Sequence, residues 1–206
     1  NNVESLAAVA LIFKHGSDSY KNIGNGRSLG TKLISLDGHF NNPGLYEVDL
    51  GTPLSRIIDE IGGGFNDDIK AIQIGGPLGG IVPVDILRSL TLDFEVFADA
   101  GFLLGHASFV CIPRSFSAVE YAKHLFAFTA HESCGKCFPC RLGSTRGKEM
   151  LGSAIDDNQK FSEELIYDLL ETMEVGSLCA LGGGLPLAIR NLLEHCGDEF
   201  KPLMEK

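Results

Sequence analysis

The chain has 206 residues, of which 44% are hydrophobic, so it is long enough to bury a core and to form one or two domains. Its 17 basic and 27 acidic residues give a formal net charge of -10, which argues against nucleic acid or an anionic membrane as a partner, because both attract a basic face. The sequence contains no apolar run of about 18 residues and so predicts no transmembrane helix.

The first part of the chain predicts a helix, a loop and then strands with one further helix. These elements are an apolar helix at 3–15 ended by Gly16, a polar, glycine-rich loop at 17–30, strands at 31–36 and 45–50, a helix at 54–61 with Thr52 as N-cap and Gly62–Gly64 as its stop, and strands at 70–74 and 81–84. Two strands, a helix and another strand within about 60 residues are compatible with a small β-grasp-like α+β domain.

The segment Gly75–Gly80, G-G-P-L-G-G, joins the last two of these strands. Glycine-rich segments also occur in nucleotide-binding loops, but this one lacks the Lys-Ser/Thr of a P-loop and does not open a helix. We therefore interpret it as a tight turn. The competing hypothesis, a free-standing enzyme acting on a small molecule at this loop, predicts turnover without flavin or partner chains.

The second part of the chain predicts one more strand and then helices. The strand at 107–112 ends at Pro113 and contains Cys111, which we interpret as a small buried apolar residue. Helices are expected at 117–130, where Ser117 and Glu120 have capping-box spacing, at 141–151, at 162–173 with Leu165, Ile166, Leu169 and Leu170 on one face, and at 185–195 with Pro186 in the first turn. Residues 115–206 therefore predict a small helical bundle.

Three cysteines with C-x2-C-x2-C spacing, Cys134, Cys137 and Cys140, follow the first of these helices, and Cys179 comes later in a glycine-rich segment. Four thiolates complete the coordination of a [4Fe–4S] cluster, and a compact triplet with one remote cysteine is typical of such sites. We therefore predict that these four residues are the metal ligands.

Other roles for the cysteines remain open. Zinc also binds four cysteines, although its sites usually consist of two separated C-x2-C pairs. Six cysteines in this length are too few for a disulfide scaffold, and nothing resembles a secretory signal. Four unrelated core cysteines are a further alternative, and Cys196 is an alternative to Cys179 as the fourth ligand.

Several charged residues and glycines lie near the cysteines. Lys136 and Arg141 would raise the potential of a bound cluster by favouring its more negative, reduced form, unless they are solvated surface charges. Gly182–Gly184 is either a site of close approach by a ligand or domain, or a simple turn. His131 and Glu132 favour structural support of the cysteine loop over acid–base catalysis, because no nucleophile accompanies them.

At this point the sequence resembles a known family. E-S-C-G-K-C-F-P-C-R with the later S-L-C-A-L-G is similar to the NADH-binding flavoprotein subunit of respiratory complex I and to the same module in soluble NAD-linked formate dehydrogenases and hydrogenase diaphorases. The other segments that resemble this family, in the same order, are Asn1–Ala7, Leu45–Leu54, Ile61–Gly64 and Gln73–Gly80. R-L-G-S-T-R-G at Arg141–Gly147 and S-L-C-A-L-G-G-G-L-P favour the formate dehydrogenase type.

The resemblance implies an α+β fold in three parts. Residues 1–30 would be the tail of an FMN- and NADH-binding domain that lies mostly outside this chain. Residues 31–114 would form a β-grasp (ubiquitin-like) domain of the soluble-ligand-binding (SLBB) type, and residues 115–206 an all-α helical bundle that carries the [4Fe–4S] cluster.

The resemblance also implies a function. The chain would be the electron-transfer portion of a multisubunit NADH:acceptor or formate:NAD oxidoreductase, passing single electrons between FMN and downstream iron–sulfur clusters. FMN would lie near Asn1, Asn2, Ala180 and Leu181, and NAD(H) would be a substrate of the full enzyme, without turnover by this chain alone. Its partners would include a thioredoxin-like 2Fe–2S subunit, and its location would be the cytoplasm or the cytoplasmic or matrix face of a membrane complex.

A hypothesis of a different class remains. In it the protein is a structural or binding module, in which a four-cysteine cluster or zinc fastens the helices together and the β-grasp domain binds a partner or a small ligand. Iron and sulfide analysis with low-temperature EPR distinguishes this hypothesis from electron transfer, because zinc is redox-silent.

Overall fold

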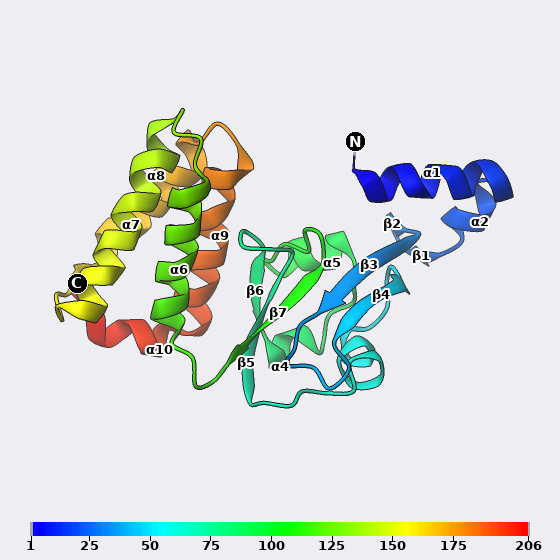
Figure 1. Cartoon of the computed structure of the whole chain (residues 1–206), viewed down its shortest axis with the longest axis horizontal. Helices are drawn as coiled ribbons and strands as arrows, with labels where there is room; N and C mark the ends of the chain where they lie inside the picture. The colour runs from blue at the N-terminus through cyan, green and yellow to red at the C-terminus, as the bar shows by residue number, and fades with distance from the viewer. Residues whose placement is uncertain (1, 206) are drawn as a thin grey trace.

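A computed structural model describes residues 2–205. Along the longest axis of the molecule, the N-terminal helix lies at one end, a sheet with short helices in the middle, and a bundle of long helices at the other end (Figure 1). The fold is therefore mixed α and β, as the sequence predicts. None of the helices in this described range is long and apolar enough to cross a lipid bilayer.

The sheet has five strands in the order β4-β3-β7-β5-β6. The strands β3 and β7 are parallel neighbours at the centre, and the remaining neighbours in the sheet are antiparallel. The first and last strands thus lie side by side between two hairpins, which is the β-grasp arrangement. The strand bounds are Thr31–Leu36 for β3, Gly44–Asp49 for β4, Ile69–Ile74 for β5, Gly80–Pro83 for β6 and Ser108–Pro113 for β7.

The helix after the second strand starts differently from the prediction. It runs as α3 (Leu54–Arg56) and continues in π-helical form as η1 (Ile57–Ile61), with Gly62 at its end as expected. The predicted Thr52 N-cap is wrong, because Pro53 is the N-cap and the Thr52 hydroxyl donates to the Asp49 carbonyl at 2.6 Å. The segment then packs on the sheet through a core that also includes residues of α4 (Val84–Leu87) and α5 (Phe94–Asp99).

The turn between β5 and β6 confirms the interpretation of the glycine-rich segment. Gly75 and Gly76 have φ angles of 93° and 97°, which side chains rarely adopt. A Cβ atom added to Gly79 would lie 1.8 Å from the Ile74 carbonyl oxygen, so the chain can only close this hairpin with glycine there. Gln73 is buried under the turn and donates from Nε2 to the Pro77 carbonyl at 3.1 Å.

The N-terminal segment stands apart from both cores. Helix α1 (Val3–His15) confirms the predicted range, yet it has no buried residue. The predicted loop at 17–30 is more ordered than expected and contains α2 (Asp18–Lys21) and a small hairpin of β1 (Gly24–Asn25) and β2 (Ser28–Leu29). The Glu4 carboxylate pairs with Lys32 and accepts the Leu33 N–H at 2.9 Å, which fastens the start of α1 to β3.

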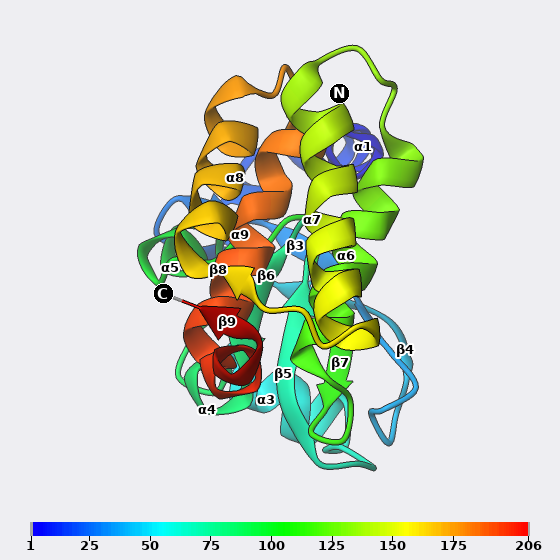
Figure 2. The same ribbon diagram turned by 90° about the vertical axis from the view of Figure 1, so that its left-hand side faces the viewer.

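The bundle consists of four long helices that cover one side of the sheet (Figure 2). They are α6 (Ala118–Glu132), α7 (Phe138–Asp156), α8 (Glu163–Gly176) and α9 (Ala180–His195), followed by α10 (Gly197–Phe200), η2 (Lys201–Leu203) and a pairing of β8 (Phe161–Ser162) with β9 (Met204–Glu205). The Ser117 hydroxyl accepts the N–H groups of Val119 and Glu120, so its predicted capping role is confirmed.

Three predictions about the bundle are wrong. Helix α7 begins inside the cysteine motif, and α9 begins at Ala180, so Gly182–Gly184 is helical and Pro186 lies in the helix interior. Leu165 is 46% exposed, whereas Ile166 and Leu170 on the same helix are fully buried. Glycine and proline usually predict helix ends, but here packing of α9 against its neighbours outweighs their low helix propensity.

The bundle and the sheet share one continuous apolar core. Ala71, Ile81 and Ile112 of the sheet belong to the same buried cluster as the helical core. The Tyr121 hydroxyl of α6 donates to Gln73 Oε1 at 2.6 Å, and its burial, assisted by the negative charge of Asp37, raises the pKa of Tyr121 to about 12. The hydroxyl is therefore neutral and able to donate at physiological pH.

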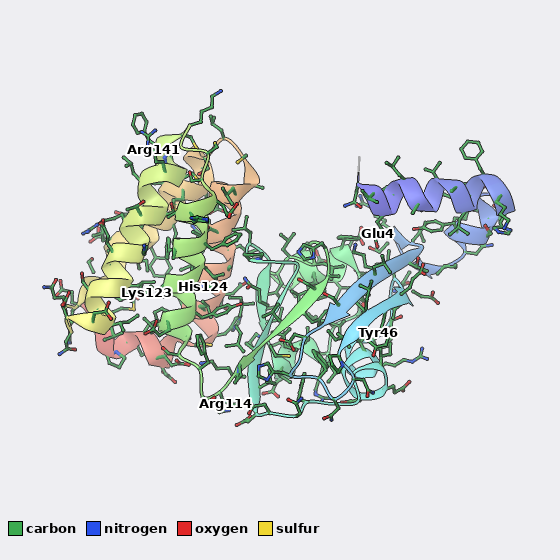
Figure 3. The ribbon with its side chains drawn as sticks, in the orientation of Figure 1. Glu4, Tyr46, Arg114, Lys123, His124 and Arg141 are labelled. Atoms are coloured by element: carbon green, nitrogen blue, oxygen red, sulfur yellow. The ribbon has the colours of Figure 1, made fainter. Side chains whose placement is uncertain are left out.

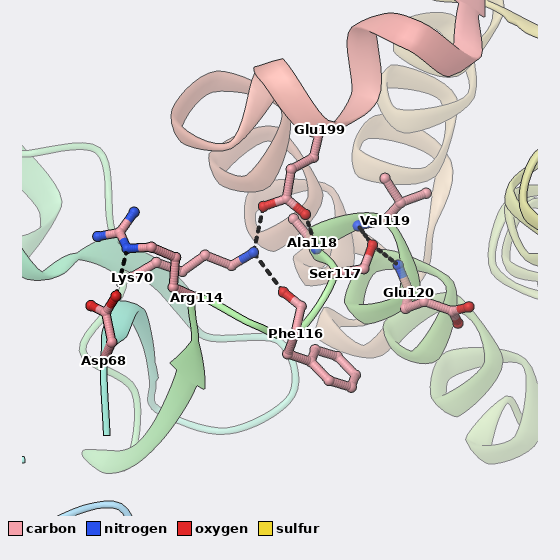
Figure 4. A network of polar contacts seen from close by, with 9 residues as sticks. All are labelled: Asp68, Lys70, Arg114, Phe116, Ser117, Ala118, Val119, Glu120 and Glu199. Carbon is pink, nitrogen blue, oxygen red and sulfur yellow. Dashed lines mark hydrogen bonds and ion pairs between the residues drawn. The ribbon is translucent and has the colours of Figure 1, made fainter. Parts of the chain in front are cut away.

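A polar network fastens the lower end of the bundle to the sheet (Figure 4). The Lys70 ammonium of β5, whose side chain is 7% exposed, pairs with Glu199 of α10 and donates to the Phe116 carbonyl at 2.6 Å. The second carboxylate oxygen of Glu199 accepts the Ala118 N–H, at the start of α6, at 2.7 Å. One ion pair thus connects the sheet, the start of the bundle and its end.

This network leads to a prediction about stability. Lys70→Met should lower the free energy of unfolding by about 1–3 kcal/mol, because it leaves a half-buried carboxylate without its cation. Urea denaturation measures the effect. Arg114→Gln is the matched control, since Arg114 and Asp68 form an exposed pair and its loss should cost about 0.5 kcal/mol or less. Equal effects of the two substitutions would contradict the role assigned to Lys70.

Candidate metal centre

The cysteine triplet and Cys179 lie at the same end of the bundle, in the connections between α6 and α7 and between α8 and α9 (Figure 1). Cys137 is the N-cap of α7, Cys140 lies in the first turn of that helix, and Cys179 is the N-cap of α9. Two antiparallel helix pairs therefore deliver segments that are far apart in sequence to one place.

Direct contacts join the two segments. The Cys137 thiol accepts a hydrogen bond from the backbone N–H of Leu178, the residue before Cys179. A Cβ atom added to Gly176 would lie 2.8 Å from Pro139 Cγ, and one added to Gly182 would lie 2.6 Å from Cys140 Cβ. The glycines around Cys179 thus allow its segment to press against the triplet, which is the close approach considered from the sequence.

The four thiols differ in exposure. Cys140 is 4% exposed and Cys137 is intermediate, whereas Cys134 and Cys179 are exposed. Hydrogen bonds from the backbone, first from Leu178 and then from Cys140, lower the pKa of the Cys137 thiol. A lowered pKa favours the thiolate, which is the form that binds metal.

Two helix N-termini meet at this site. The N-caps of α7 and α9 are both cysteines whose side chains do not cap their helices, so the first N–H groups of these helices remain available. Helix N-termini favour negative charge. An iron–sulfur cluster with four thiolate ligands is an anion, so the donor set and the electrostatic field of the site both fit such a group. Zinc bound by four cysteine thiolates would also be anionic and would benefit in the same way.

The loop that carries the triplet is held by Arg141. Gly135 has a φ of 77°, and the Arg141 guanidinium donates to its carbonyl oxygen while lying 4.7 Å over the Phe138 ring. Figure 3 shows Arg141 at the cysteine end of α7. Lys136 is exposed, and Arg146 pairs with Glu149 at 3.7 Å on the surface. Arg141 is therefore the cation most closely tied to the loop.

Other residues singled out in the sequence lie away from the thiols. The side chains of His131 and Glu132 are 86% and 52% exposed and pair with each other at 4.0 Å, so the expected support of the cysteine loop is not seen. Cys196 lies at the opposite end of α9 from Cys179, and this 16-residue helix is about 24 Å long. Cys111 is buried in β7, as predicted, and burial raises the pKa of its thiol.

Within residues 2–205, no three His, Cys, Asp or Glu side chains converge closely enough to ligate a single metal ion. The four thiols are thus gathered by contacts between their segments and not at single-ion spacing.

The residues expected near FMN are only partly described. Asn1 lies outside the described residues. Asn2 is the N-cap of α1, where its side chain accepts the Glu4 N–H at 2.8 Å, and Ala180 and Leu181 form the first turn of α9 beside Cys179. The start of α1 and the cysteine end of the bundle lie on the same side of the molecule (Figure 1).

Sequence reasoning missed two serines at this site, Ser133 and Ser177. The Cys140 thiol lies 3.3 Å from Ser133 Oγ, and Ser177 Oγ is buried beside Gly182. Their positions next to cysteines, in E-S-C and S-L-C, were the available signal. Serine is common in loops, so this signal was weak.

A β-grasp sheet joined to a helical bundle that gathers four cysteines at two helix N-termini is the architecture of a redox-protein module, and comparison with known proteins identifies the family. Residues 120–202 match the family model described as NADH-ubiquinone oxidoreductase-F iron-sulfur binding region. This chain therefore carries the iron–sulfur binding region of that family, and the resemblance stated from the sequence is confirmed.

The relatives extend the match to the rest of the chain. NADP-reducing hydrogenase subunit HndC of Solidesulfovibrio fructosivorans is 36% identical over 211 residues, which cover 98% of this chain and 41% of the relative. In Rhizobium meliloti, the second of two F subunits of NADH-quinone oxidoreductase is 35% identical over 209 residues, covering 100% and 49%. The chain thus spans less than half the length of these curated relatives.

A solved structure agrees with this assignment. The crystal structure of an NAD+-reducing [NiFe]-hydrogenase in the H2-reduced state matches with a TM-score of 0.87 and 28% identity, over 100% of this chain and 35% of that one. The whole arrangement of α1, the sheet and the bundle therefore recurs in a chain of an oxidoreductase.

Proposed function

We propose that this chain is the electron-transfer portion of an NAD(H)-linked flavin and iron–sulfur oxidoreductase, with a [4Fe–4S] cluster held by Cys134, Cys137, Cys140 and Cys179. The observation that carries the proposal is the hydrogen bond from the Leu178 N–H to the Cys137 thiol, which joins the segment of the remote cysteine to the triplet. It lies inside the region that matches the iron–sulfur family.

The four side chains differ in how they would hold and expose the cluster. When bound, a [4Fe–4S] cluster accepts and releases one electron at a time. The buried Cys140 anchors this group to the bundle, and the exposed Cys134 and Cys179 keep one side accessible to a donor or acceptor. The free N–H groups at the starts of α7 and α9 stabilise its negative charge.

The finer parts of the proposal rest on the family resemblance. They are that FMN lies near Asn1, Asn2, Ala180 and Leu181 and is bound mainly by a preceding domain, that residues 1–30, 31–114 and 115–206 are separate structural parts with an SLBB-type domain in the middle, and that a thioredoxin-like 2Fe–2S subunit is among the partners. The acceptor side is of the NADH dehydrogenase or the formate dehydrogenase type, in the cytoplasm or on the cytoplasmic or matrix face of a membrane complex. The relatives support a multisubunit setting, since their names describe them as subunits.

Anaerobic reconstitution with iron and sulfide tests the proposal. We expect about four irons and four sulfides per chain, and an EPR signal at low temperature after reduction with dithionite, as a redox-active [4Fe–4S] cluster requires. Parallel loading with zinc is the control. Tight zinc binding without a reducible cluster would favour the alternative, in which the metal only fastens the helices and the β-grasp domain binds a partner or small ligand.

A further inference from the structure

A buried hydroxyl at the metal centre has no partner in the protein. Among the side chains of residues 2–205, only Thr129 Oγ1 and Ser177 Oγ are buried polar atoms without a hydrogen bond. Thr129 lies within α6, beside the carbonyl groups of its own helix, whereas Ser177 lies outside any helix, two residues before Cys179. Buried hydroxyls are nearly always paired, so the partner of Ser177 is expected to come from outside the polypeptide.

The position of Ser177 identifies where that partner lies. A Cβ atom added to Gly182 would be 2.5 Å from Ser177 Oγ and 2.6 Å from Cys140 Cβ. The serine hydroxyl and the buried cysteine therefore contact the same point on α9. Because Cys140 is 4% exposed, this is the enclosed side of the centre, where water does not substitute for a missing partner.

A second serine approaches Cys140 from the other side. Ser133 Oγ accepts the Cys140 thiol at 3.3 Å and the Gly135 N–H at 3.2 Å. When Cys140 binds iron, its thiol proton passes to solvent and its sulfur becomes an acceptor only. The hydrogen bond must then reverse, with the Ser133 hydroxyl as the donor and the sulfur as the acceptor.

We propose that the hydroxyls of Ser133 and Ser177 donate hydrogen bonds to sulfur atoms of the cluster, Ser133 to Cys140 Sγ and Ser177 to the sulfur that faces it, and thereby raise the reduction potential. The physical reason is charge. Reduction adds an electron to the cluster and its cysteine sulfurs, so a hydrogen-bond donor stabilises the reduced form more than the oxidised form. This inference rests on the proposed function, because it requires a cluster at these cysteines.

Potentiometric titration followed by EPR, on the anaerobically reconstituted protein, tests this proposal. Iron and sulfide are measured first, so that absence of a cluster in the unsubstituted protein, which contradicts the proposed function, is distinguished from an unaltered potential in the variants. Ser133→Ala and Ser177→Ala are each expected to keep the cluster and to shift its midpoint potential downward, with a larger downward shift in the double variant.

Ser144→Ala is the matched control. Ser144 is also buried and lies one turn from Cys140, but its hydroxyl donates to the Cys140 carbonyl at 2.6 Å and is not free to reach a sulfur. Its midpoint potential should equal that of the unsubstituted protein. Potentials of both serine variants equal to this control would overturn the proposal.

A conservative variant decides the case in which Ser177→Ala loses the cluster. Ser177→Thr retains the hydroxyl, and a cluster with the original potential in this variant supports the hydrogen bond. Loss of the cluster from both Ser177 variants would instead assign the serine a purely structural role and would count against the inference.

Discussion

Replacing Cys179 with alanine is expected to remove the [4Fe–4S] signal from the reconstituted protein. The triplet supplies three thiolates, and without the fourth the cluster either fails to assemble or keeps about three irons, with the EPR signal of a different cluster type. Iron analysis and EPR of the oxidised and dithionite-reduced protein measure the loss. The segment Ser177–Leu178 would still reach Cys137, so the fold should survive the substitution.

Cys196→Ala is the matched control for this experiment. Cys196 follows the same helix, but about 24 Å from its cysteine end, and is half-buried. Iron content and the EPR signal should therefore be unchanged in this variant. An unaltered four-iron signal in Cys179→Ala, with a loss in Cys196→Ala, would show that the fourth ligand had been assigned to the wrong cysteine.

Gly182→Ala is expected to impair cluster assembly without removing any ligand. The added methyl group would lie 2.5 Å from Ser177 Oγ and 2.6 Å from Cys140 Cβ, both closer than real contacts allow. The segment of Cys179 must then move away from the triplet. Overpacking of this kind costs about 1–3 kcal/mol, which should exceed the gain of about 1 kcal/mol from replacing a helical glycine. Iron content after reconstitution and the urea denaturation midpoint both measure the effect.

The adjacent residue supplies the control for this substitution. A Cβ atom on Gly183 would lie 3.5 Å from the Glu174 carbonyl oxygen, which is an ordinary contact. Gly183→Ala should therefore keep the iron content and stabilise the helix by up to about 1 kcal/mol. If the two variants assembled the cluster equally well, close packing of α9 on the triplet would not be needed to gather the four cysteines.

By itself, the sequence determined the features that depend on local chemistry. The spacing of Cys134, Cys137 and Cys140 predicted an iron–sulfur site, the apolar strands at 31–36 and 70–74 predicted a sheet, and Ser117 predicted a helix start, because each depends on neighbouring residues. The family resemblance carried the order of these parts along the whole chain.

Only the tertiary structure decided what depends on contacts between distant segments. Glycines at 182–184 and Pro186 indicated a helix that starts late, yet α9 begins at Ala180, since the lack of a side chain at Gly182 is what allows this helix to pack against Cys140. The same packing buries the Ser177 hydroxyl and brings the Leu178 N–H to Cys137. These relations join residues about 40 positions apart, and residue type and spacing do not encode them because they arise only when α7 and α9 lie side by side.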